Sequence, residues 1–132
     1  MKSHLDLAKA LASKAKHDLE MAEIGIKHDA PLDTISFHLQ QTVEKLFKAL
    51  LASKNIDYPK THDLMLLLDL SLPEFPHLHR YREDLIGMAS YAVDMRYDDA
   101  VYPDQDEVLA TWQAVKEITE TLFASLPPEA QP

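Results

Sequence analysis

Apolar side chains recur at intervals of three and four residues along nearly the whole chain, and this periodicity restricts the fold more than any other feature. Residues at this spacing share one face of an α-helix. The first run consists of Leu5, Ala8, Ala12, Ala15, Leu19, Ala22 and Ile26. The charged residues of this segment fall largely outside that face: Lys9, Lys16, Asp18, Glu20, Glu23 and Lys27. No segment shows the alternation typical of a strand, so the sequence predicts an all-α protein.

The prolines and the capping residues divide this pattern into four to five helices of an up-and-down helical bundle. Ser3 with Asp6 predicts the first N-terminus, Thr61 the third, and Asp104 with Glu107 the last. The expected helices span about residues 3–28, 31–53, 61–70, 77–95 and 104–124. We expect a single domain over residues 1–126, followed by a frayed, disordered tail at 127–132.

Composition excludes several classes of function. The 132 residues support one modest core, and the chain has no cysteine, which excludes disulfides, thiolate metal sites and a cysteine nucleophile. Its 2 glycines argue against a glycine-rich phosphate loop. The N-terminus becomes charged before any apolar run, and no segment approaches the roughly 20 apolar residues of a membrane span. We therefore expect a cytoplasmic protein with neither a signal peptide nor a membrane contact.

Charge is distributed unevenly around a formal net charge of −9. Residues 38–62 carry four lysines against Glu44 and Asp57, a local balance of +2. Residues 94–120 carry eight carboxylates against Arg96 and Lys116, a balance of −6. An acidic chain does not bind duplex DNA through its overall field, because that affinity depends on neutralising phosphates. A local anion site in 38–62 stays possible, and the acidic region is either a solvated face or a surface for a basic partner.

One edge of the second expected helix carries hydrogen-bond donors suited to phosphate. His38, Gln41, Lys45 and Lys48 are spaced three, four and three residues apart. The alternative is an ordinary polar helix edge, on which lysine is common. His62 adds a further donor at the start of the third helix, although the adjacent aspartate competes for the same helix N-terminus.

Aromatic and guanidinium groups gather at the end of the fourth expected helix. Arg96 is suited to a phosphate, and Tyr91 or Tyr97 to stacking on a base, while the alternative for Arg96 is a neighbouring carboxylate or the helix dipole. His77 and His79 point about 200° apart on a helix, so they do not chelate one metal ion. We expect no metal and no cofactor.

Taken together, three segments resemble the HEPN domain, the higher eukaryotes and prokaryotes nucleotide-binding domain. They are Phe37–Leu51, Thr61–Leu64 and Tyr91–Tyr97, and the similarity extends over about residues 3–124. The resemblance implies a helical bundle, commonly a homodimer, from a prokaryotic cytoplasm. Small stand-alone members often pair with a minimal nucleotidyltransferase, and many such pairs act as toxin and antitoxin.

Some HEPN domains are metal-independent ribonucleases, and the resemblance implies where their signature belongs. It consists of an arginine followed four to six residues later by a histidine, which supply charge stabilisation and acid–base catalysis. Here Arg96 is followed by Tyr97 and the residues up to Tyr102 without a histidine, and Arg80 and Arg82 have none at that distance. The signature is therefore missing.

Three hypotheses follow. The first is a non-catalytic HEPN protein that binds a nucleotide, an RNA or another phosphate-bearing ligand, pairs with itself and acts with a nucleotidyltransferase. Its ligand-binding residues are Lys45, Lys48, His62, Arg96 and Tyr97, supported by His38, Gln41 and Tyr91. The second is a divergent ribonuclease in which His62 replaces the missing histidine. The third is a plain protein-interaction module.

Overall fold

The computed structural model describes the backbone of residues 3–97 and 102–132, and the side chains of 3–89 and 102–132. Five α-helices and no strand occur in these described segments, which confirms the predicted all-α helical bundle. The helices are α1 (His4–Lys27), α2 (Leu32–Ser53), α3 (Leu64–Ser71), α4 (Arg82–Tyr97) and α5 (Gln105–Ser125). Two short 3₁₀ helices, η1 (Pro76–Tyr81) and η2 (Pro128–Ala130), complete the elements.

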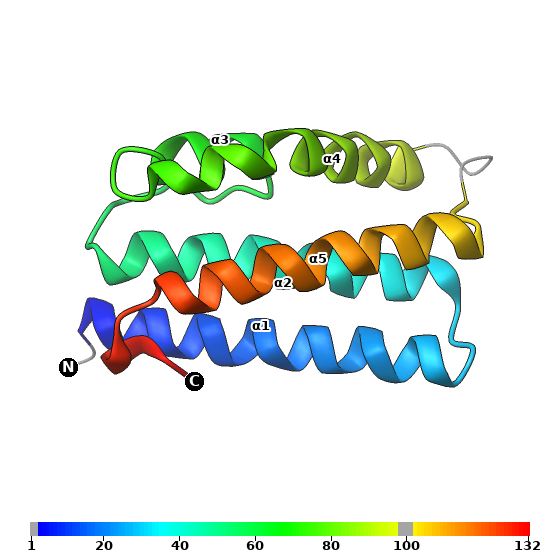
Figure 1. Ribbon diagram of the computed structural model, residues 1–132, viewed down its shortest axis with the longest axis horizontal. Helices are drawn as coiled ribbons and strands as arrows, with labels where there is room; N and C mark the ends of the chain where they lie inside the picture. The colour runs from blue at the N-terminus through cyan, green and yellow to red at the C-terminus, as the bar shows by residue number, and fades with distance from the viewer. Residues whose placement is uncertain (1–2, 98–101) are drawn as a thin grey trace.

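The long helix α2 is the centre of the bundle. Helix α1 lies antiparallel along one side of it, α3 and α4 lie on the opposite side, and α5 crosses in front (Figure 1). The largest fully buried side chains include Leu39, Leu46, Phe47 and Leu50 of α2. Within the described residues, no helix is both long and apolar enough to cross a membrane.

The contact between α1 and α2 depends on small residues. Ala8, Ala12, Ala15 and Ala22 are all completely buried, which confirms the predicted alanine face. A methyl side chain lets the backbone of a partner helix approach closely, so this seam is tight along its whole length. The two helices form the most extensive contact in the bundle.

Helix boundaries agree with the capping signals at most positions. Ser3 and Asp6 form a reciprocal capping box, and the Asp104 side chain accepts a hydrogen bond from the amide of Glu107, both as predicted. The third helix differs, because its cap is Asp63 and not Thr61. Thr61 Oγ1 instead accepts a hydrogen bond from the Asp63 amide. The cap is therefore set by the residue whose oxygen reaches the first free amides of the helix.

The segment predicted as one helix over 77–95 is divided. Residues from Pro76 to Tyr81 form the 3₁₀ turn η1, and the α-helical bonds begin only at Arg82. A 3₁₀ turn is common at a helix N-terminus, where it tightens the first turn.

The expectation of a frayed tail at 127–132 was wrong. Ala130 is completely buried, and η2 packs against α1. The Gln131 side chain donates hydrogen bonds to the carbonyl oxygens of Phe123 at 2.7 Å and Leu126 at 3.0 Å. The Phe123 carbonyl also accepts the Leu126 amide, and the added bonds to these carbonyls at the end of α5 hold the following turn in place.

Substitution by alanine is expected to have opposite effects on stability at the two glycines. A Cβ atom at Gly25 lies 2.9 Å from Ile35 Cγ1, whereas one at Gly87 has no atom within 4 Å. We expect Gly87→Ala to raise the free energy of unfolding by about 0.5–1 kcal/mol, because alanine is the better helix former. We expect Gly25→Ala to lower it by about 1 kcal/mol, because the contact outweighs that gain. Urea denaturation of both variants measures the difference, and an equal gain in both contradicts the close approach at Gly25.

Candidate functional site

A cluster of three residues forms around Asp18, where α1 faces one edge of α2. The Asp18 carboxylate accepts a hydrogen bond from Lys45 Nζ at 2.5 Å, and its other oxygen lies 2.9 Å from His38 Nδ1. Asp18 belongs to α1, while His38 and Lys45 are seven residues apart and therefore lie on one side of α2. The Asp18 side chain is 12% exposed, and these two partners replace water around its carboxylate.

A second cluster forms around Glu44, further along α2. Lys48 Nζ donates to Glu44 Oε2 at 3.1 Å from one turn away, and His62 Nδ1 lies 3.1 Å from both carboxylate oxygens. The Glu44 side chain is only 3% exposed, whereas that of His62 is 66% exposed. The loop before α3 thus places an accessible imidazole over a buried carboxylate.

The two clusters share one chemical arrangement. In each, a carboxylate holds the Nδ1 atom of a histidine, and a lysine ammonium binds the same carboxylate. When Nδ1 carries the proton that is shared with the carboxylate, the ring orientation is fixed and Nε2 is the atom that a ligand meets. Each lysine uses one of its three donors on the carboxylate, so further donors remain for an anion.

Four of the eight predicted residues are thus brought into these clusters, although their lysines are already ion-paired. Gln41 lies on the same edge, between the positions of His38 and Lys45, and is partly exposed. Tyr91, Arg96 and Tyr97 belong to α4, but their side chains lie outside the described residues. The two clusters therefore contain the predicted residues His38, Lys45 and Lys48 of α2 together with His62, and none of the predicted residues of α4.

Sequence reasoning missed the two carboxylates that organise the clusters. Asp18 was placed outside the apolar face, yet it lies three residues after Ala15 and four before Ala22, both completely buried. That spacing was the available signal for its burial. The only sequence signal for Glu44 is its position one turn before Lys48. This signal is weaker, because the burial of Glu44 depends on the loop that carries His62, which is distant in the sequence.

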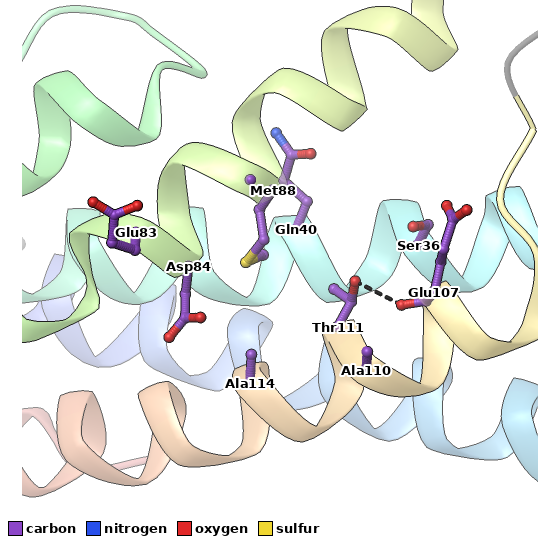
Figure 2. Close-up of a pocket in the computed structure, with 10 residues that line it drawn as sticks. Ser36, Gln40, Glu83, Asp84, Met88, Glu107, Ala110, Thr111 and Ala114 are labelled. Atoms are coloured by element: carbon purple, nitrogen blue, oxygen red, sulfur yellow. Dashed lines mark hydrogen bonds between the residues drawn. The ribbon is translucent and has the colours of Figure 1, made fainter.

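A separate groove lies between α4 and α5, with α2 as its floor (Figure 2). Its volume is about 410 Å³, within the range of small-molecule sites. It is lined by Ser36, Gln40, Glu83, Asp84, Gly87, Met88, Glu107, Ala110, Thr111 and Ala114. The carboxylates of this groove make it acidic, in contrast to the α2 edge.

Metal binding finds no support in the described part of the chain, where no three His, Asp or Glu side chains gather closely enough to hold an ion. Comparison with protein families identifies the HEPN domain, whose model aligns with residues 8–125. No curated protein and no solved structure matches the chain.

Proposed function

Because the chain belongs to the HEPN domain family, we propose that it binds a nucleotide, a short RNA or another phosphate-bearing ligand without cleaving it, and that it acts with a nucleotidyltransferase partner. HEPN domains commonly pair with nucleotidyltransferases, which supports the second half of this proposal. A homodimer and a role in a toxin–antitoxin pair are further parts of the same proposal.

The observation that carries the binding proposal is the accessible His62 imidazole over the buried Glu44 carboxylate. Its Nδ1 atom is held at 3.1 Å, so Nε2 presents a donor to a phosphate in a fixed direction once the ring is protonated. The Lys48 ammonium lies on the same carboxylate and is 16% exposed, so its spare donors lie beside the imidazole. Lys45 and His38 offer the same pair of groups on the Asp18 cluster. In this proposal Arg96 and Tyr97 contact the ribose or base, with Gln41 and Tyr91 in support.

The test of binding is a thermal-shift series with ATP, AMP and a short RNA. A ligand at about a hundredfold over its Kd adds roughly 2.7 kcal/mol to the free energy of unfolding, which raises Tm by several degrees. We expect His62→Gln to lower the affinity for the ligand about tenfold, because the substitution removes one charge-assisted hydrogen bond. His79→Gln, at an exposed histidine outside both clusters, is the matched control and leaves the shift unchanged.

Two outcomes contradict the binding proposal. The first is a flat response of the wild-type chain to all three ligands, and the second is an equal response in His62→Gln. The partner is tested separately, by size-exclusion chromatography with a minimal nucleotidyltransferase from the same genome. Elution of the two proteins as separate peaks at micromolar concentration argues against a stable pair.

The Glu44–His62 pair also favours a second candidate, a divergent metal-independent ribonuclease. A histidine positioned by a buried carboxylate is suited to general acid–base catalysis, and Arg96 would stabilise charge on the phosphate. This candidate requires RNA cleavage in the presence of EDTA that disappears in both His62→Ala and Arg96→Ala. RNA that stays intact with the wild-type protein rules it out.

A further inference from the structure

The groove between α4 and α5 exists because these two helices diverge over α2. Among the described residues, α4 makes its main contacts with α2, α3 and η1, and not with α5. The resulting space of about 410 Å³ is open along one side, so an elongated molecule can enter it. It is separate from the two clusters on the α2 edge.

Carboxylates stand at both ends of the groove. Figure 2 shows Glu83 and Asp84 of α4 toward one end and Glu107 of α5 toward the other. Within the described residues, none of these three carboxylates has an ion pair or a side-chain hydrogen bond. The groove therefore presents separated negative charges that no side chain of the described structure neutralises.

The cations nearest in sequence are used elsewhere. Arg80 binds Glu117 at 3.4 Å, and Arg82 binds Asp69 at 2.8 Å. Both interactions direct the guanidinium groups to carboxylates that do not line the groove. No cation of the described residues pairs with the groove carboxylates, so they are open to an external cation.

The middle of the groove is apolar. Met88 of α4 and the methyl groups of Ala110 and Ala114 of α5 lie between the two acidic ends (Figure 2). Gly87 has no side chain and leaves room beside them. A ligand with methylene groups between two positive charges fits an apolar surface between two acidic ends, because its methylenes lose contact with water there.

The floor supplies a hydroxyl group. Ser36 is 8% exposed, lines the groove from α2, and its side chain makes no hydrogen bond with the described residues. Its hydroxyl remains available to a ligand in the groove. Gln40 lies one turn further along the same floor.

We propose that the groove between α4 and α5 binds a linear aliphatic polyamine. Ammonium groups at its two ends bind Asp84 with Glu83 and Glu107, while the methylenes cover Met88 and the alanines. An inner ammonium, where present, donates to Ser36 Oγ. A compact metal ion is a poor match, because no three potential ligands converge in the described part of the chain.

Isothermal titration calorimetry with spermidine, putrescine and MgCl₂ tests this proposal at constant ionic strength. We expect spermidine to bind at least tenfold more tightly than Mg²⁺. The variant Asp84→Asn/Glu107→Gln lowers spermidine affinity at least tenfold. The matched control Glu120→Gln/Glu129→Gln removes the same charge from exposed carboxylates outside the groove and changes affinity less than twofold.

A steric variant separates the groove from general electrostatic attraction. Gly87→Leu keeps the net charge and places a side chain in open space, so the helix is retained while the groove is filled. We expect the affinity of this variant for spermidine to be at least tenfold lower than that of the wild type. Equal losses in the control pair, Mg²⁺ binding as tight as spermidine, unchanged binding in Gly87→Leu, or no binding by the wild-type protein would each overturn the proposal.

Discussion

Replacing Lys48 by methionine should lower the free energy of unfolding by about 3 kcal/mol and Tm by roughly 10 °C. The reason is the Glu44 carboxylate, which is 3% exposed and receives the Lys48 ammonium at 3.1 Å. Removing Lys48 leaves the buried Glu44 charge with His62 as its remaining side-chain partner among the described residues. Urea denaturation followed by circular dichroism measures the change.

The double variant Glu44→Gln/Lys48→Met isolates that charge. It removes the buried carboxylate together with its cation, so we expect it to recover at least half of the lost stability. Lys9→Met is the control at an exposed lysine and should stay within about 0.5 kcal/mol of the wild type. A change below 1 kcal/mol in Lys48→Met itself contradicts the dependence of Glu44 on this lysine.

Enlarging Ala12 to leucine should lower the free energy of unfolding by about 2–3 kcal/mol. Ala12 is completely buried in the seam between α1 and α2, where the added carbons force the two helices apart. Chemical denaturation of Ala12→Leu and Ala10→Leu compares the seam with an exposed site on the same helix. Both substitutions change helix propensity by the same small amount, so the difference between them reports packing. Equal stability of the two variants contradicts a tight seam.

The sequence was sufficient for the fold because the signals that define it are local. Apolar spacing located α1, α2 and α5, and the oxygen atoms of Ser3 and Asp104 marked two helix starts correctly. Thr61 and Asp63 are both good caps, and only the geometry of the loop decides between them. The prediction of a frayed end was wrong because the order of this segment depends on Gln131, which donates hydrogen bonds to the carbonyls of Phe123 and Leu126. Composition alone does not indicate such a contact.

The candidate site was predicted less completely because its pairings are not local. The row of donors on α2 was visible as a spacing, but Asp18 and Lys45 are 27 residues apart and meet only through the register of α1 against α2. That register also determines that Lys45 is paired internally, whereas Lys48 pairs with Glu44 one turn away on α2 itself. The groove had no signal in the sequence, since it arises from the divergence of α4 from α5.

The uneven attachment of α4 also has a consequence for how the molecule opens. Among the described residues, α1, α2 and α5 share the larger contacts, whereas α4 is held chiefly through α3, η1 and α2. Regions with fewer packed neighbours unfold locally at a lower free energy than the whole domain. We therefore expect the amide hydrogens of α4 to exchange with solvent through a partial opening that leaves α1, α2 and α5 assembled. Any molecule that bridges α4 and α5 slows this exchange and joins the two parts into one cooperative folding unit.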